Sequence, residues 1–280
     1  MNLDEWLRSR EKSLAASGVP FPRRDVLIFA QRTLDADKAR LLAHPELELE
    51  DKQLRELDGF IQRRKAREPV QYILGKQEFW GISVKVGPGC LIPRPETEHL
   101  VETALSLIGD IPNPRVAELG TGSCCVLLAL AKERPDAVLI GIEKEEEALK
   151  WAGVNTVGIP SIHLLRGDSA SPPVLSNVDV VIANPPYVTD EEWDELPLEI
   201  KQWEPSSSLR CGGNPLAPYR SVARWAALAL KPGGGLACEI GVAQARRASA
   251  LRRIHPSMAW CDGIRDYSGK LRVVCWTRRE

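Results

Sequence analysis

Strand-like and helix-like patterns alternate along this chain from residue 115 to its end. Short apolar stretches that predict parallel strands, separated mostly by amphipathic helical patterns, lie at 115–119, 137–143, 162–166, 178–183 and 235–240. Parallel strands need a crossover between them, so this alternation predicts a doubly wound α/β sheet that is covered on both faces. Two further strands, at 258–262 and 271–277, have no helix between them, and we expect them to pair antiparallel.

The first part of the chain has a different pattern. Between residues 3 and 66, apolar side chains recur at helical intervals. Strand patterns at 70–74 and 82–86, with glycines between them, then predict a hairpin. We therefore expect a helical domain over residues 1–68, a β-hairpin linker over 69–94 and the α/β domain over 95–280.

The composition of the 280-residue chain is that of an ordinary globular protein, and its net charge is −1. A protein that binds nucleic acid mainly by neutralising phosphates is usually more basic. The seven cysteines include no C-x-x-C pair, and the four histidines show no ligand spacing. No apolar run approaches the ~18 residues of a membrane span. We therefore expect a cytoplasmic protein without a metal, a membrane segment or a leader.

A glycine-containing segment, Glu118-Leu119-Gly120-Thr121-Gly122-Ser123, joins the first strand of the sheet to a helix. Glycines there let a ligand approach the backbone, and the N–H groups at the helix start point toward it. A tight strand-to-helix turn would produce the same pattern. Glu143 ends the next strand about twenty residues later, where an acidic side chain binds ribose hydroxyls in doubly wound sheets. Alternatively, Glu143 could belong to the acidic first turn of the helix that follows, with no role in binding a ligand.

Asp168 follows the third strand and could accept a hydrogen bond from an adenine amine, or else cap a helix or turn. A dinucleotide oxidoreductase is the competing interpretation of these features. It expects a third glycine where Cys125 stands, because glycines there admit the pyrophosphate. S-adenosylmethionine carries no phosphate, so the missing glycine favours it over a dinucleotide.

The strongest motif is Asn184-Pro185-Pro186-Tyr187, directly after the strand at 178–183. In the expected strand order that strand lies beside the first one, so the motif and the glycine segment face one crevice. The Asn184 side-chain carbonyl and the Pro185 main-chain carbonyl can accept both N–H bonds of a planar –NH2 group, whose nitrogen is otherwise a poor nucleophile. The prolines fix these carbonyls, and Tyr187 offers a flat face for stacking. The motif predicts methyl transfer to an amide or an exocyclic amine.

Together these residues resemble the protein-(glutamine-N(5)) methyltransferases of the HemK/PrmC type, which modify peptide chain release factors. The resemblance extends from about residue 67 to the end and is most specific at Leu91-Ile92-Pro93-Arg94-Pro95-Glu96-Thr97-Glu98. Further matching segments lie at 67–75, 79–81, 118–123, 184–187, 204–205, 219–220, 239–241 and 266–272. The Asn-Pro-Pro-Tyr motif alone is shared with adenine and cytosine amino-methyltransferases.

The resemblance implies a seven-stranded, Rossmann-like methyltransferase sheet and a small N-terminal helical domain that docks the release factor. It implies that S-adenosylmethionine is the cofactor and that Asn184, Pro185, Pro186 and Tyr187 hold a glutamine amide. The cofactor-binding residues that we predict are Glu118, Gly120, Thr121, Gly122, Ser123, Cys124, Glu143, Asp168, Ser169 and Asn184. Cys124 stands where the family usually has a third glycine. We expect a monomeric enzyme that methylates the glutamine in the Gly-Gly-Gln loop of class 1 release factors.

Other functions fit parts of this pattern. A nucleic-acid amino-methyltransferase would flip a base out of its stack and normally carries clustered Lys and Arg, whereas the insertion at 188–214 is acidic. A glutamine in a ribosomal protein would suit the same chemistry as a release factor. A non-catalytic binding protein with this fold would not need the intact motif at 184–187.

Overall fold

The computed structural model describes residues 1–168, 173–266 and 268–280. It divides the chain into two compact units. The helical unit comprises Met1–Leu74 and Leu198–Trp203, and the sheet unit comprises Gly75–Pro197 and Glu204–Glu280. The helical unit is therefore discontinuous in sequence, because one of its segments comes from the middle of the chain.

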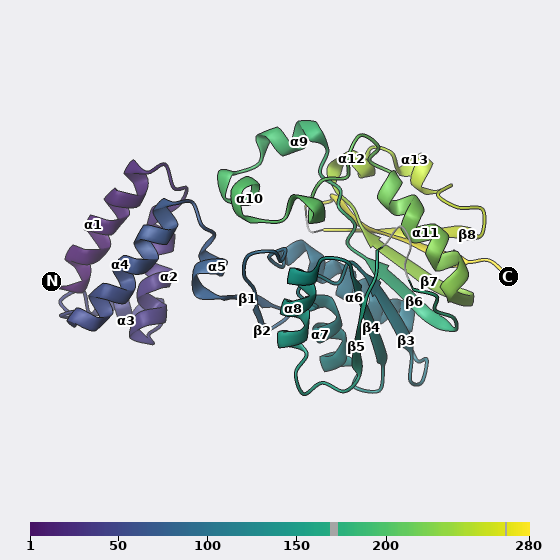
Figure 1. The fold of residues 1–280 in the computed structure, drawn as a ribbon, viewed down its shortest axis with the longest axis horizontal. Helices are drawn as coiled ribbons and strands as arrows, with labels where there is room; N and C mark the ends of the chain where they lie inside the picture. The colour runs from purple at the N-terminus through teal and green to yellow at the C-terminus, as the bar shows by residue number, and fades with distance from the viewer. Residues whose placement is uncertain (169–172, 267) are drawn as a thin grey trace. The chain divides into compact units, whose positions relative to one another are not determined.

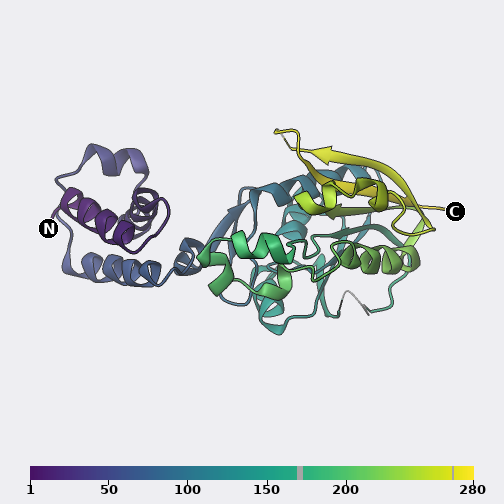
Figure 2. The same ribbon diagram turned by 90° about the horizontal axis from the view of Figure 1, so that it is seen from above.

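The helical unit is built from short amphipathic helices (Figure 1 and Figure 2). These are α1 (Leu3–Ala16), α2 (Pro22–Leu34), α3 (Lys38–Ala43), α4 (Asp51–Lys65), α5 (Val70–Leu74) and α10 (Leu198–Trp203). A capping box between Asn2 and Glu5 starts α1 by satisfying N–H groups that have no partner within the helix. Trp6, Phe29 and Leu57 are fully buried at the centre of the unit, where their apolar surface stabilises the packing of α1, α2 and α4.

The strand predicted at 70–74 is wrong, because these residues form helix α5. The Pro69 carbonyl accepts hydrogen bonds from the N–H groups of Tyr72 and Ile73, which closes a helical turn. A short apolar run is compatible with a strand or a buried helix, so its pattern alone could not decide. A hairpin does follow: β1 (Lys76–Phe79) pairs antiparallel with β2 (Ile82–Lys85). Trp80 and Gly81 both have positive φ, as tight hairpin turns require.

The seven-stranded sheet that the resemblance implied is confirmed. Its strands are β3 (Arg115–Leu119), β4 (Val138–Glu143), β5 (Ile162–Arg166), β6 (Val178–Ala183), β7 (Leu230–Glu239), β8 (Met258–Arg265) and β9 (Leu271–Arg278). They lie in the order β5-β4-β3-β6-β7-β9-β8. The first five of these are parallel. Strand β9 pairs antiparallel with β8, as the absence of a helix between them predicted, and it also pairs antiparallel with β7.

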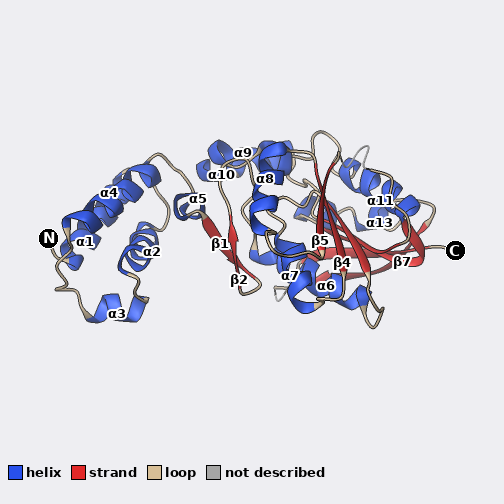
Figure 3. Ribbon diagram, turned by 60° about the horizontal axis from the view of Figure 1, so that its bottom comes forward, coloured by secondary structure: helices blue, strands red, loops and turns tan. Residues whose placement is uncertain are grey.

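Helices cover both faces of this sheet (Figure 3). One face carries α6 (Glu98–Ile108) and α7 (Cys125–Glu133), and α8 (Glu146–Asn155) packs along β4 and β5. The other face carries α11 (Ala217–Ala229) and α13 (Ala248–Leu251). A short helix, α12 (Val242–Ala245), precedes α13 and is separate from it, although no glycine or proline lies between them.

The remaining short elements are η1 (Pro95–Thr97), α9 (Asp190–Glu195) and η2 (Ser206–Ser208). Across the described part of the chain, every helix is too short or too polar to cross a membrane. Strand order reverses between β3 and β6, which are neighbours in the sheet, and Leu119 at the end of β3 is paired with Ala183 at the end of β6. The glycine segment and the Asn184–Tyr187 motif therefore leave the sheet side by side, at the switch point where α/β sheets bind ligands.

Candidate active site

A cleft of the sheet unit opens at the carboxyl ends of β3, β4 and β6. Its empty volume is about 880 Å3 including the open mouth, which suits a small organic ligand. Residues from the glycine segment, the end of β4, the Asn184 motif and the loop before α6 line it together. They are Leu91, Pro93, Arg94, Thr97, Glu118, Gly120, Thr121, Gly122, Ser123, Cys125, Val126, Glu143, Lys144, Glu145, Gly167, Asn184, Pro186, Ser207 and Ser208.

The glycine segment turns sharply from β3 into α7. Gly120 has φ 73° and Gly122 has φ 54°, a left-handed backbone that other residues adopt only with strain. The N–H groups of Gly120 and Thr121 both donate to the Ile142 carbonyl, at 2.8 and 3.2 Å. These bonds fix the segment to the end of β4, so its turn forms one wall of the cleft.

Glu143 is the best-held acidic side chain of the cleft. Its Oε2 accepts from the N–H of Gly122 at 2.9 Å, and its Oε1 accepts from the N–H groups of Lys144 and Glu145 at 2.8 and 3.0 Å. Three main-chain donors thus orient a buried carboxylate toward the cleft, and its remaining lone pairs can accept from a ligand.

Glu118 lies deeper, with a side chain that is almost completely buried. Its pKa is raised to about 8, first by burial and then by the charge of Glu143, against the hydrogen bond that Thr121 Oγ1 donates to its Oε2 at 2.5 Å. At neutral pH this carboxyl is therefore mostly protonated, which avoids placing two negative charges in the same end of the cleft.

Several predicted site residues lie away from this cleft lining. Cys124 is fully buried with φ 69° at the start of α7, and Cys125 is the cysteine that lines the cleft. Burial raises the pKa of both thiols, so neither is a reactive thiolate. Asp168 and Pro185 are not among the lining residues. Ser169 lies outside the described residues.

The Asn184 motif forms the other wall of the cleft. Asn184 lines both the cleft and a small adjoining pocket that Tyr187 also lines. The Asn184 Nδ2 donates to Thr97 Oγ1 at 3.4 Å, and the Tyr187 hydroxyl donates to Glu239 Oε1 at 3.3 Å. Burial raises the pKa of Tyr187, so its hydroxyl stays protonated. The sequence motif predicted Asn184 and Tyr187 but neither of these partners.

The loop before α6 is held by Glu204, a carboxylate that was not predicted as part of the site. Glu204 is buried, accepts from the N–H of Ile92 at 3.0 Å and forms an ion pair with Arg94. Arg94 and Thr97 both belong to the most specific matching segment of the sequence, which had been given no role in the site. The match of that segment to the family was the sequence signal from which a role for Arg94 and Thr97 in the site could have been predicted.

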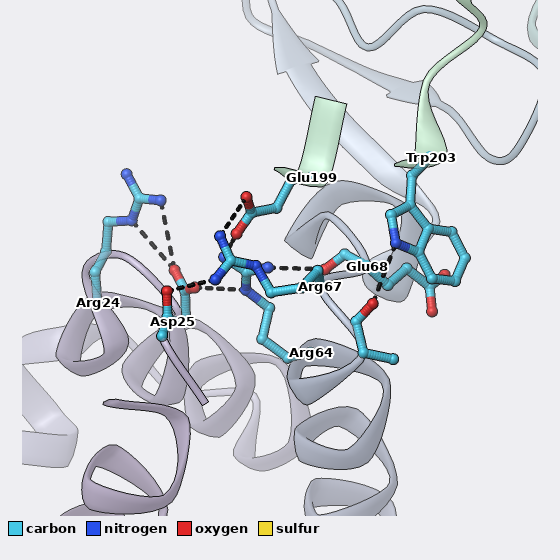
Figure 4. Close-up of polar contacts among 9 residues, drawn as sticks. Arg24, Asp25, Arg64, Arg67, Glu68, Glu199 and Trp203 are labelled. Carbon is cyan, nitrogen blue, oxygen red and sulfur yellow. Dashed lines mark hydrogen bonds and ion pairs between the residues drawn. The ribbon is translucent and has the colours of Figure 1, made fainter. Parts of the chain in front are cut away.

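A cluster of charged side chains holds α10 in the helical unit (Figure 4). Arg64 pairs with Asp25 at 2.8 Å and with Glu199 at 2.9 Å, and Arg67 pairs with Glu199 at 2.8 Å. Burial opposes ionisation of Glu199, but its bonds to Arg67 and Arg64 prevail and lower its pKa below the usual range. Among the acidic residues of the insertion, Glu199 is therefore buried and paired within the helical unit, whereas Glu191 and Glu195 are exposed to solvent.

Within the described residues, no three or more His, Cys, Asp or Glu side chains gather in an arrangement that could hold a metal ion. The polar groups of the cleft are instead N–H groups and hydroxyls, which can donate hydrogen bonds, and carboxylates, which accept them. They match the hydroxyl, amine and carboxylate groups of a small polar molecule.

Comparison with known proteins identifies relatives of both units. The PrmC N-terminal domain matches residues 5–75, and the methyltransferase small domain matches residues 97–200. The release factor glutamine methyltransferase of Cereibacter sphaeroides is 35% identical over 276 residues, which cover 98% of each chain. The release factor glutamine methyltransferase of Escherichia coli K12 is 34% identical over 279 residues, again 98% of each chain.

Two solved structures share the fold at low sequence identity. A methyltransferase from Pyrococcus furiosus has a TM-score of 0.54 and 18% identity, covering 78% of this chain and 100% of the other. The hMettl16 catalytic domain, solved in complex with MAT2A 3′UTR hairpin 6, has a TM-score of 0.55 and 15% identity, covering 84% of each chain. Both similarities support the methyltransferase fold and nothing finer.

Proposed function

This chain belongs to the family of release factor glutamine methyltransferases, and from that premise we propose that it methylates the glutamine in the Gly-Gly-Gln loop of class 1 release factors. The reaction class is S-adenosylmethionine-dependent methylation of a protein glutamine nitrogen. The observation that carries the finer proposal is the placement of Asn184 between a ligand-sized cleft and the pocket that Tyr187 lines.

The cleft fits S-adenosylmethionine in its chemistry. Gly120 and Gly122 leave the backbone open to a ligand, and the Glu143 carboxylate retains lone pairs for ribose hydroxyls. When bound, this cofactor supplies an electrophilic methyl group. Cys124, Asp168 and Ser169 stay in the proposed cofactor-binding set, together with Glu118, Thr121 and Ser123.

Asn184 and Pro185 would hold the reacting nitrogen. Two carbonyl oxygens that accept its N–H bonds localise the lone pair on nitrogen and stabilise the positive charge that develops as the new N–C bond forms. The nitrogen then loses one proton to water, so no strong base is needed. Tyr187 would stack on the planar amide and keep its nitrogen in line with the methyl group.

A release factor loop suits this site better than a nucleic acid. A glutamine between two glycines can enter a narrow pocket, because no neighbouring side chain obstructs its rim. The exposed carboxylates of Glu191 and Glu195 would repel phosphates but could pair with a basic protein surface. The helical unit would provide further docking area, since one loop buries too little surface for specific recognition.

The proposed substrate is tested by methylating purified release factors with labelled S-adenosylmethionine and mapping the site by mass spectrometry. We expect the label at the Gly-Gly-Gln glutamine only, and much slower methylation of a short peptide that carries the same loop. Ribosomal proteins and single-stranded DNA or RNA serve as competing acceptors. Label on one of these, with unmodified release factors, would replace the proposal with that alternative.

Replacing Glu143 with alanine tests the proposed ribose contact. We expect weaker binding of S-adenosylmethionine by roughly 1.5–3 kcal/mol, the usual worth of hydrogen bonds to a charged acceptor. Glu143→Gln should lose less, because its carbonyl oxygen can still accept from some of the three N–H groups. Calorimetry measures both dissociation constants, and Glu147→Ala on the exposed side of α8 is the control. A Glu143→Ala constant equal to that of the wild type would remove Glu143 from the cofactor site.

A further inference from the structure

Glu239 is a buried carboxylate next to the proposed glutamine pocket. It ends β7, the neighbour of β6 in the sheet, and its side chain is only 2% exposed. The Tyr187 hydroxyl donates to its Oε1, while its Oε2 has no hydrogen-bond partner among the described residues. An uncompensated buried carboxyl oxygen destabilises a fold, so its presence here requires a reason beyond packing.

Thr97 connects this carboxylate to Asn184. Its side chain is buried, its Oγ1 accepts from Asn184 Nδ2, and hydrogen bonding from its hydroxyl lowers the pKa of Glu239. A hydroxyl has a single proton to donate. Because that proton is directed at Glu239, the Thr97 oxygen can only accept from Asn184. The Asn184 amide must then present its NH2 group to Thr97, which leaves its carbonyl oxygen for the substrate.

We propose that Glu239 is a positioning residue for methyl transfer: as the last acceptor of the Thr97 and Tyr187 hydroxyls, it sets the orientation of the Asn184 amide and of the Tyr187 ring. This inference rests on the proposed function, in which both side chains hold the glutamine amide. With the opposite amide orientation, Asn184 would direct N–H groups at the N–H groups of the substrate, and the proposed acceptor would be lost.

The turn after β7 restrains Tyr187 from its other end. A β-carbon at Gly241 would lie 2.7 Å from Cδ2 of the Tyr187 ring, so only glycine fits against that ring. The Gln244 Nε2 donates to the main-chain carbonyls of Tyr187 and Pro215, at 3.0 and 3.2 Å. The ring and main chain of Tyr187 are thus fixed by packing and by Gln244, and Glu239 fixes its hydroxyl.

The ionisation state of Glu239 decides whether its carboxyl group acts only as an acceptor. Burial raises its pKa to about 7, Thr97 and Tyr187 lower it by hydrogen bonding, and the charges of Glu96 on η1 and Arg272 on β9 act in opposite directions. The ionised form can only accept. The protonated form has a proton of its own to donate, so the Thr97 hydroxyl is free to rotate and the Asn184 amide to turn over.

The test compares Glu239→Gln with the wild type in methylation of a release factor. The introduced glutamine has nearly the same volume as glutamate, but its amide can donate as well as accept and it does not titrate near neutral pH. We expect kcat to fall roughly ten- to hundredfold, as for a misplaced reacting group. KM for the release factor and the dissociation constant for S-adenosylmethionine should stay within about threefold, because Glu239 lines neither the cleft nor the adjoining pocket.

The pH profile separates positioning from a general structural role. Wild-type kcat should rise as the pH increases through about 7, where Glu239 becomes ionised. In Glu239→Gln this rise should be absent. The matched control is Tyr219→Phe, which removes a buried hydroxyl that donates to the main-chain oxygen of Glu239 at 3.0 Å and leaves its carboxylate intact. The control should keep the wild-type pH profile.

A second pair of variants keeps the inference testable if Glu239→Gln does not fold. Thr97→Val removes the connecting hydroxyl and should lower kcat more than Thr97→Ser, which retains it. Equal rates for the two Thr97 variants, or wild-type kcat and pH dependence in a folded Glu239→Gln, would overturn the positioning role. If the wild type itself modifies no release factor, the proposed function fails instead, whatever the variants do.

Discussion

Replacing Asn184 with alanine is expected to lower the rate of glutamine methylation by roughly 10²–10³-fold while the protein stays folded. Removal of one preorganised polar group at a developing charge has an effect of that size. Asn184 is only partly buried, and the hydrogen bond from its side chain to Thr97 is 3.4 Å long, so its loss should disturb packing little. Single-turnover kinetics with a release factor measures the rate of the chemical step directly.

Two measurements make the Asn184 experiment decisive. Circular dichroism and calorimetry with S-adenosylmethionine show whether the variant is folded and how much cofactor affinity it has lost. Asn214→Ala is the control, because Asn214 lies in a loop and lines neither the cleft nor the adjoining pocket. A folded Asn184→Ala variant with the wild-type single-turnover rate would refute the acceptor mechanism.

Replacing Arg64 with methionine is expected to lower the free energy of unfolding of the helical unit by about 3–5 kcal/mol. Arg64 is almost fully buried between Asp25 and Glu199, and loss of one partner leaves buried charges uncompensated. Methionine retains much of the apolar volume, so the charge effect should dominate. Chemical denaturation followed by circular dichroism measures the change.

The matched control for Arg64 is Arg10 in the same unit. Arg10 pairs with Asp58 at 2.8 Å, but both side chains are partly exposed to solvent. Arg10→Met should therefore lower stability by about 1 kcal/mol or less, as is usual for surface ion pairs. If the Arg64 and Arg10 variants lose equal stability, the buried cluster does not provide the stabilisation that its geometry indicates.

The sheet could be predicted from the sequence because its strands are buried on both faces. All six residues of β6 are buried, and all but Asp179 are apolar, so the strand is an apolar stretch that ends directly before Asn184. The segment Val70–Leu74 is also a short apolar run, yet it forms α5. Within so few residues, a strand pattern and a buried helical turn are indistinguishable. In the structure the segment forms a helical turn, which is closed by hydrogen bonds to the Pro69 carbonyl.

The candidate site was only partly predictable, for a different reason. The residues at 120–123 and 184–187 follow strands directly, so strand order alone places them together. Thr97 and Glu239 act through side-chain contacts with Asn184 and Tyr187, which lie 87 and 52 residues away from them in sequence. No local periodicity encodes such contacts. For the same reason, the acidic composition of the insertion could not show that Glu199 pairs with an arginine 135 residues earlier.

The discontinuity of the helical unit also has a consequence for the order in which the protein folds during synthesis. Helices α1 to α5 leave the ribosome first, but Arg64 and Arg67 meet Glu199 only after strands β3 to β6 have been made. The helical unit therefore remains incomplete, without α10, until strands β3 to β6 have emerged from the ribosome. A fragment that ends at residue 74 lacks α10, and a fragment that begins at residue 75 contains α10 without Arg64 and Arg67. Neither fragment therefore keeps the contacts between α10 and the rest of the helical unit.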